Sequence, residues 1–288
     1  MAGMGIELEV LLLPAYDDLP GLPSEVAPWL DTFDFTDRVE LAGNDSVMWV
    51  TDDGIGMVPT GVGKLAAATT TAAIGMTDAV GIDRATIISA GIAGGPPSHV
   101  SIGSLVLATT LVDWDNKLRF DQPRTTQSVP IEPNPYNIQR AVVRLNQSRV
   151  SRFASQLDAN ALCEAVEREA ANHSLHLPEP DIHLGTNLCG DELFHGHVVA
   201  DQAETLVKAH GCGPYLSTEM EDIGTAIALE QCGLLDQYLS VRAISNPDRP
   251  IDIDGAGGFD DEQLAEGARV ALAGLLAALE PAVNGLVR

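Results

Sequence analysis

The chain has 288 residues, of which 45% are hydrophobic, and a formal net charge of −25 at pH 7. Nucleic-acid backbones are bound by clustered lysine and arginine, so a chain with 41 acidic and 16 basic residues is not expected to bind nucleic acid. The four cysteines are scattered without a CxxC pair, which favours free thiols in a reducing compartment over a disulfide framework or zinc.

The ends and the overall composition give no sign of targeting or of a second domain. The first residues lack the basic start and apolar middle of a secretory signal, and no run of about 18 uninterrupted apolar residues predicts a membrane span. We therefore expect a cytoplasmic protein that does not enter a membrane. No break in composition divides the chain, so residues 1–288 are expected to form a single domain.

Strands and helices are predicted to alternate along the chain. Short apolar, β-branched runs predict strands at residues 9–15, 85–90, 104–114, 181–185, 216–218 and 238–245, with a hairpin over 46–59. Helical patterns cover residues 24–30, 64–76, 138–146, 160–172, 198–210, 221–232 and 261–279. This alternation implies a largely parallel sheet covered on both faces, in which ligands bind at the carboxyl ends of the strands.

A glycine-rich segment follows the predicted strand at residues 85–90. The sequence ATIISAGIAGG, residues 85–95, is an apolar run that ends on three glycines and two alanines. We interpret its end as a turn bare of side chains, on whose backbone a small ligand can lie. The loops after Gly185 and Ser245 also follow strands, so all three loops are expected to meet around one ligand.

A second glycine segment, TGVGK at residues 60–64, opens the helix at residues 64–76. A phosphate-binding P-loop would need glycine in place of Val58 and serine or threonine in place of Leu65. The segment also lacks the third glycine of a dinucleotide fingerprint. We interpret it as a tight strand-to-helix turn, which leaves no support for a nucleotide cofactor.

Two other segments are weak candidates for a metal. The acidic loop at residues 252–263 has Ala256 at a ligand position of a calcium loop and Gln263 in place of its closing glutamate. His195 and His197 have no carboxylate or third histidine at ligand spacing. We therefore expect no metal.

The segment Glu219-Met220-Glu221-Asp222 places three carboxylates at the start of a predicted helix. Buried and unpaired, these groups would cost considerable free energy. Acidic residues favour a helix amino terminus, so the cluster could cap the helix. The same position also suits contact with a ligand, and both interpretations stay open at this point.

Five segments taken together resemble one family in the same order along the chain: TGVGK, IISAGIAGG, GDELFHG, STEMEDIGTAIAL and VRAISN. They are similar to the nucleoside phosphorylase and nucleosidase superfamily, and most of all to its purine nucleoside permease branch. The resemblance implies a three-layer α/β sandwich with a central mixed, largely parallel sheet. It also implies cleavage of the N-glycosidic bond of a purine nucleoside, by hydrolysis or phosphorolysis, through an oxocarbenium-like transition state.

The resemblance also bears on partners. It implies a small purine nucleoside as the ligand, a homo-oligomer, and no cofactor, with inorganic phosphate as co-substrate if the reaction is phosphorolysis. The alternative is a nucleoside-binding or uptake-associated protein without turnover, as the name permease suggests.

By the same resemblance, eight residues are expected to bind the substrate: Ala93, Gly94, Phe194, Glu219, Met220, Glu221, Arg242 and Ser245. Glu221 matches the glutamate that holds the ribose hydroxyls, with Met220 beneath the sugar. Phe194 falls in the loop whose apolar residue flanks the base. A carboxylate beside a developing sugar cation is physically sensible.

The predicted catalytic residues are Glu221 and one of two groups at the base. Nucleosidases specific for methylthioadenosine and S-adenosylhomocysteine carry an aspartate where Asn246 stands. An aspartic acid can deliver a proton to N7, whereas an amide can only form a hydrogen bond. Asn246 could stabilise a departing 6-oxopurine, as in trimeric purine nucleoside phosphorylases, or Asp248 could supply the acid.

The nucleophile is the other open point. Phosphorylases of the related hexameric group have an arginine just ahead of the glycine segment. Here the nearest basic residue, Arg84, lies at the far end of the predicted strand. This favours water as the nucleophile, unless Arg119, Arg124 or a neighbouring subunit supplies the charge.

Overall fold

The structure is a computed structural model that describes residues 6–119, 131–250 and 260–287. Its main sheet has ten strands: β2 Val10–Leu13, β3 Phe35–Glu40, β4 Val47–Thr51, β5 Ile55–Met57, β7 Thr86–Gly95, β8 Leu105–Asp113, β11 Val142–Arg144, β12 Ile182–Cys189, β13 Tyr215–Glu219 and β14 Tyr238–Pro247. Two short pairs lie apart from it: β1 Ile6–Glu7 with β6 Val80–Gly81, and β9 Lys117–Arg119 with β10 Ile131–Pro133.

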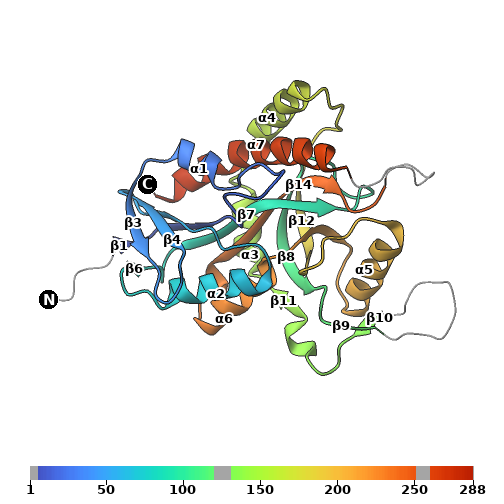
Figure 1. Ribbon diagram of the computed structural model, residues 1–288, viewed down its shortest axis with the longest axis horizontal. Helices are drawn as coiled ribbons and strands as arrows, with labels where there is room; N and C mark the ends of the chain where they lie inside the picture. Colours follow the sequence, from blue (N-terminus) through green and yellow to red (C-terminus); the bar gives the residue numbers. More distant parts are fainter. Residues whose placement is uncertain (1–5, 120–130, 251–259, 288) are drawn as a thin grey trace.

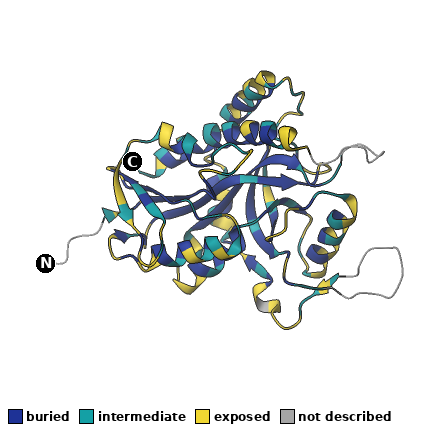
Figure 2. Ribbon diagram, viewed as in Figure 1, coloured by how far each residue is buried: buried dark blue, intermediate teal, exposed yellow. Residues whose placement is uncertain are grey.

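Helices cover both faces of the main sheet (Figure 1). They are α1 Ala27–Thr32, α2 Lys64–Gly75, α3 Gln147–Ala154, α4 Ala159–Asn172, α5 His197–Ala209, α6 Asp222–Gln231 and α7 Asp261–Leu286, with 3₁₀ turns η1 Ile138–Arg140 and η2 Leu235–Gln237. The long α7 crosses one face, and α2 and α6 pack side by side on the other. Figure 2 shows the central strands buried and the outer faces of the helices exposed.

The main sheet is mixed, as expected, and part of it closes on itself. Strands β7 and β14, β8 and β12, and β12 and β13 pair in parallel, whereas β14 with β8 and β13 with β7 pair antiparallel. These five strands therefore form a closed ring. On one side of the ring, Gly94 pairs with Asn246 of β14 and Thr218 of β13. The closure brings together the carboxyl ends of β7, β13 and β14, which are far apart in the sequence.

The predicted glycine turn after residue 90 is wrong, because β7 continues to Gly95. None of its three glycines has a positive φ, so no turn conformation requires them. They are needed for close approach instead. A methyl group at Gly91 would lie 2.5 Å from Glu25 Oε1, and one at Gly94 would lie 2.8 Å from Thr218 Oγ1. The segment is a strand whose bare surface admits neighbouring side chains.

The other strand and helix predictions are confirmed in type and place, although α7 runs seven residues past its predicted end; the exception is the helix over 138–146. That segment is a 3₁₀ turn followed by β11, which pairs with β8. The helix α3 begins only after Asn146, whose side chain accepts a hydrogen bond from the Arg149 backbone and caps the helix. The edge strand β3, paired with β4, was not predicted.

Helix α7 is the one helix among the described residues that is long and apolar enough to cross a membrane. Half of its most apolar 18-residue window is buried, and the helix packs on β14, β7 and α4. A core helix of a globular protein meets the same criteria of length and composition. The finding therefore does not assign a membrane span.

Replacing Gly267 by alanine should destabilise the fold next to the ends of β7 and β14. A methyl group there would lie 2.0 Å from the Ser245 carbonyl oxygen, where α7 packs on β14. We expect a loss of about 1–3 kcal/mol in the free energy of unfolding, measured in urea. Gly285→Ala on the same helix is the matched control, because no atom lies within 4 Å of its added methyl group. Equal stability of the two variants would contradict this account of the packing.

Candidate active site

A cavity opens where β7, β13 and β14 end, and it brings together most of the predicted site. The predicted residues that line it are Ala93, Gly94, Glu219, Met220, Glu221, Ser245 and Asn246. A larger hollow beside α4 contains none of the predicted site residues. The smaller cavity is therefore the candidate active site.

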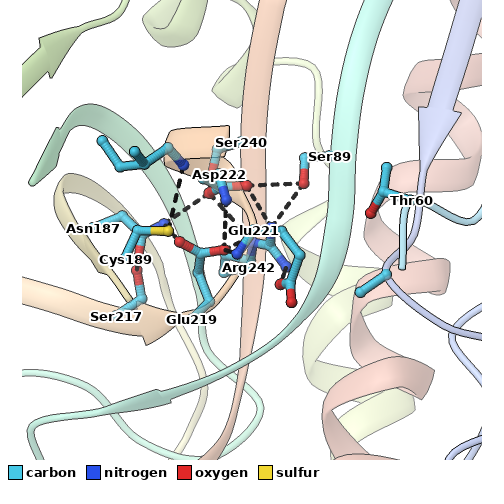
Figure 3. Close-up of polar contacts among 12 residues, drawn as sticks. Thr60, Ser89, Asn187, Cys189, Ser217, Glu219, Glu221, Asp222, Ser240 and Arg242 are labelled. Carbon is cyan, nitrogen blue, oxygen red and sulfur yellow. Dashed lines mark hydrogen bonds and ion pairs between the residues drawn. The ribbon is translucent and has the colours of Figure 1, made fainter. Parts of the chain in front are cut away.

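Three carboxylates surround one guanidinium beneath the cavity (Figure 3). Arg242 is 1% exposed. Its Nη2 lies 3.0 Å from Glu219 Oε2, its Nη1 lies 3.5 Å from Glu221 Oε2, and it also contacts Asp222. Arg242 does not line the cavity. In this structure it supports the carboxylates from behind, and a direct contact between Arg242 and a substrate stays a prediction.

Asp222 is the most completely paired of the three acids. It accepts hydrogen bonds from Asn187 Nδ2 at 2.7 Å, Tyr238 Oη at 2.8 Å and Ser89 Oγ at 2.9 Å. Burial by itself would raise the pKa of Asp222. The charge of Arg242 and the hydrogen bonds that Arg242, Ser240 and Tyr238 donate outweigh burial and lower that pKa below its ordinary value. Of the three acids, Asp222 alone has a lowered pKa, so its ionised form is the favoured counter-charge of Arg242.

Glu219 and Glu221 divide the two roles that the sequence left open. Glu219 Oε2 accepts the backbone N–H groups of Glu221 at 2.7 Å and Asp222 at 2.9 Å, so it caps α6. Glu221 makes no capping bond; its Oε1 accepts the backbone N–H of Gly63 at 3.1 Å. Both also line the cavity. Helix capping and exposure to the cavity thus coexist in the cluster, and contact with a ligand stays a prediction.

Both glutamates hold a proton far more tightly than an exposed carboxyl does. Burial raises the pKa of Glu219 to about 8, and the negative charge of Asp222 adds to the rise. Burial also raises the pKa of Glu221 to about 7, against the lowering effect of Arg242. Glu221 therefore changes charge near neutral pH, which is the range where a carboxyl can both bind and exchange protons.

Glu25 also lines the cavity, and sequence reasoning missed it. It is 1% exposed, and its two oxygens accept the backbone N–H groups of Ala15 and Ile92, each at 2.7 Å. Burial raises the pKa of its carboxyl above the ordinary value. In the sequence Glu25 is one acid in a proline-rich acidic stretch, with no motif around it. Only the approach of this loop to Gly91 reveals it.

Asn246 retains one hydrogen-bond donor for a ligand. Its Oδ1 accepts from Ser245 Oγ at 2.7 Å, and its Nδ2 donates to the Pro247 carbonyl at 3.1 Å. A side-chain amide carries two N–H groups, so one of them has no partner among the described residues at the cavity wall. Ser245 Oγ also lies 3.1 Å from the Ala93 carbonyl, which ties β14 to β7 beside the site.

Asp248 does not line the cavity. It is completely buried, contacts the Tyr215 hydroxyl, and accepts from Arg249 Nε at 2.9 Å. Its backbone N–H donates to the Gly95 carbonyl at 2.9 Å. These contacts anchor the end of β14, and they leave the role of Asp248 as a proton donor to the base a prediction.

Phe194 does not line this cavity; it lines a small adjoining hollow that shares Leu193, Glu219 and Met220 with the cavity, and it packs on Trp114 at 5.6 Å between ring centroids. The preceding residue, Leu193, lines the cavity and is 63% exposed. The loop is therefore where the resemblance placed it, but a neighbouring side chain faces the ligand space. Contact of Phe194 with the base stays a prediction.

Among the residues that the structure describes, no lysine, arginine or histidine lines the cavity. Arg84 is exposed and precedes β7, at the opposite end from the cavity. Lys64 is held by Asp113 at 2.8 Å and Asp115 at 2.7 Å. Arg124 and the side chain of Arg119 fall outside the described residues. The charged side chains that line the largely apolar cavity are all acidic, and the described part of the wall offers no cation for a phosphate.

The glycine segment at residues 60–64 is the expected strand-to-helix turn. Gly61 and Gly63 have φ of +84° and +94°, which favour glycine. Across residues 6–119, 131–250 and 260–287, no group of three His, Cys, Asp or Glu could hold a metal. Most of the loop at residues 252–263 lies outside those ranges.

Comparison with known proteins gives a family and a fold. A family model described as purine nucleoside permease (NUP) matches residues 7–288. A purine nucleoside permease from Candida albicans is 24% identical over 291 residues, which cover 91% of this chain and 72% of that protein.

Two solved structures share the fold. The 5′-methylthioadenosine/S-adenosylhomocysteine nucleosidase from Neisseria meningitidis, in complex with methylthio-immucillin-A, has a TM-score of 0.61 and 17% identity, with coverage of 96% of this chain and 100% of that one. The futalosine hydrolase of Helicobacter pylori strain 26695 has a TM-score of 0.58 and 20% identity, covering 96% and 98%. The fold is thus that of purine nucleosidases. Because the family model spans nearly the whole sequence, the chain belongs to the purine nucleoside permease family.

Proposed function

We propose that the protein cleaves the N-glycosidic bond of purine nucleosides. The observation that carries this proposal is the meeting of Glu221 and Asn246 in one cavity beside Gly94. Glu221 offers a carboxylate to sugar hydroxyls, and Asn246 offers a free amide N–H to a base. A nucleoside carries both groups, a sugar with hydroxyls and a base. The fold shared with nucleosidases supports the same conclusion.

The cavity suits the charge that develops during cleavage. As the glycosidic bond breaks, the sugar becomes positive and the departing purine becomes negative. Carboxylates close to the sugar stabilise the cation, and a hydrogen bond from Asn246 Nδ2 stabilises the leaving base. Both groups are held by their neighbours before the ligand arrives, so the reaction does not have to reorganise them.

Water is favoured as the nucleophile. Glu25, Glu219 and Glu221 line the cavity, and no basic residue does so within the described parts of the chain. The described wall therefore offers no cation to bind a phosphate anion, whereas the ionised form of a carboxyl such as Glu25 can accept a proton from an attacking water. Phosphorolysis would need a cation from Arg124, outside the described residues, or from a second subunit.

The decisive experiment incubates the pure protein with inosine, adenosine and guanosine, with and without phosphate, and measures the free base by chromatography. Base that appears equally in both conditions indicates hydrolysis. Base that appears only with phosphate indicates phosphorolysis and would overturn the preference for water. No base in either condition would overturn the proposed cleavage.

A second candidate function is nucleoside binding without turnover. The family name and the Candida albicans relative favour it, and so does Asn246, because an amide cannot donate a proton to N7 as an aspartic acid can. Calorimetry separates the two candidates. Tight binding of inosine without any product would establish binding alone.

The same proposal includes a single domain, a cytoplasmic location and a homo-oligomer. The burial of half of the apolar window of α7 supports a protein that keeps this helix inside its own fold. Fractionation of the host cell tests the location, and light scattering of the pure protein tests the oligomer. A membrane-bound or monomeric protein would overturn the corresponding part.

Replacing Asn246 and Asp248 separately by alanine should have different effects. Asn246→Ala removes the free donor at the cavity and should slow cleavage about 100-fold with little change in stability. Asp248→Ala leaves Tyr215 and Arg249 without their buried acceptor, so we expect a loss of about 1–3 kcal/mol in stability. Turnover and urea unfolding measure the two effects. If neither variant slows cleavage, the assignment of this segment to the base is wrong.

A further inference from the structure

The Tyr16 side chain brings an unused hydroxyl to the candidate active site. Tyr16 lines the cavity and is 9% exposed. Its hydroxyl oxygen is buried and has no hydrogen-bond partner among the residues that the structure describes. Leaving a buried hydroxyl unpaired is costly, so native proteins seldom keep one without a reason. A partner that arrives with the ligand would supply that reason.

The surroundings of Tyr16 define what such a partner must be. The carboxylates that act on the hydroxyl are Glu25 and Glu221, and both line the same cavity. Burial, with the negative charge of these two groups, raises the pKa of the phenol, so it stays neutral and keeps its proton. Tyr16 is therefore a donor beside two acceptors that it does not reach directly.

A sugar hydroxyl can satisfy both kinds of group at once. Its hydrogen can be accepted by a carboxylate, while its oxygen accepts a hydrogen from a phenol. Ionised glutamates only accept, so they cannot satisfy the oxygen of such a hydroxyl. Of the side chains lining the cavity, Tyr16 is the one with a buried polar atom that lacks a described partner.

We infer that Tyr16 is a substrate-binding residue, whose hydroxyl donates a hydrogen bond to a sugar hydroxyl that in turn donates to Glu221. This inference rests on the proposed nucleoside site and extends it. It makes the pocket selective for nucleosides that keep this hydroxyl. Loss of the ligand hydroxyl leaves Tyr16 unpaired, as in the empty site, and removes the hydrogen bond to Glu221.

The test compares wild type with Tyr16→Phe, using adenosine and its 2′-deoxy, 3′-deoxy and 5′-deoxy forms. The readout is kcat/KM if these nucleosides are cleaved, and Kd by calorimetry if they are bound without cleavage. Wild type should discriminate against one deoxy form. Tyr16→Phe should reduce that one discrimination roughly 2- to 13-fold, the worth of a single net hydrogen bond, and the affected form identifies the hydroxyl.

A second measurement separates ligand binding from a structural role. Without ligand, Tyr16→Phe should be as stable as wild type or more stable in thermal unfolding, because the hydroxyl it removes has no partner in the described part of the chain. Tyr136→Phe is the matched control; Tyr136 is 90% exposed and does not line the cavity, so neither readout should change.

Three results would overturn the assignment of Tyr16 alone. They are unchanged discrimination among the four nucleosides, an equal slowing of all four, which indicates a hydroxyl that positions water, and a lower melting temperature of the empty variant. Failure of wild type to bind any nucleoside would overturn the proposed function, and this inference with it.

Discussion

Replacing Glu221 by glutamine is expected to lower the turnover of purine nucleosides about 100-fold or more, the largest loss of activity that the structure predicts. The variant keeps the size of the side chain and an oxygen that can accept the Gly63 backbone N–H. It cannot ionise, so it loses the negative charge that Glu221 carries above its pKa of about 7 and the strong acceptor for sugar hydroxyls. Because these interactions strengthen in the transition state, kcat should fall more than KM rises.

The control for this variant is Glu230→Gln, which makes the same chemical change at an exposed position on the same helix, α6. Its turnover should equal that of wild type. Circular dichroism and thermal unfolding would verify that Glu221→Gln is folded. A folded variant with turnover within about threefold of wild type would remove Glu221 from the mechanism, and with it the observation on which the proposed function rests.

Replacing Arg242 by methionine is expected to cost about 3–5 kcal/mol in the free energy of unfolding, the largest loss of stability. The guanidinium is buried among Glu219, Glu221 and Asp222. Methionine fills much of the same space but leaves three buried carboxylates without a counter-charge. Such groups are then more stable as neutral acids, so their pKa values should rise in the variant.

The loss of stability in Arg242→Met should depend on pH. Whether it grows or shrinks with pH follows from the protonation states of the three acids. In the wild type the pKa values of Glu221 and Glu219 are already raised, to about 7 and about 8. A carboxyl whose pKa is raised in the folded state contributes stability at low pH that is lost as pH rises through that pKa. In Arg242→Met the pKa of Asp222, lowered in the wild type, rises as well. The difference in stability between the two proteins should therefore be larger at pH 8 than at pH 5.

Urea unfolding at the two pH values measures this difference. Arg152→Met, at an exposed position on α3, is the control and should differ little from wild type at either pH. A deficit that is independent of pH would mean that the cost of Arg242→Met comes from packing rather than from unpaired charge.

The local pattern of apolar and polar residues was enough to predict most of the strands and helices. Period-two and helical spacing located the strands and helices because these signals act over a few residues. The five segments that resemble one family, taken in their order along the chain, also indicated that family. They contain seven predicted site residues that line the cavity. The one mistaken helix, over residues 138–146, fails for a local reason too, because Asn146 is a cap where the helix α3 starts.

The composition of the cavity wall was not predictable in the same way. Glu25 and Tyr16 reach the site because their loop runs against β7, where Gly91 leaves room for the Glu25 carboxylate. Leu193 lines the cavity in place of the predicted Phe194, because Phe194 packs against Trp114, 80 positions earlier in the chain. Nothing in the sequence beside these residues distinguishes them from neighbours that stay outside the cavity.

The sequence by itself therefore determined most of the elements, their order and the segments that line the cavity. The glycines after residue 90 show the limit of that information: they suggested a turn, and the structure uses them in a strand so that Thr218 and Asn246 can approach Gly94 from either side. Only the closed ring of strands decides which acids share Arg242 and which are buried. Burial and charge act through space, so the raised pKa of Glu221 and the buried Tyr16 hydroxyl, which lacks a partner among the described residues, arise only in the folded protein.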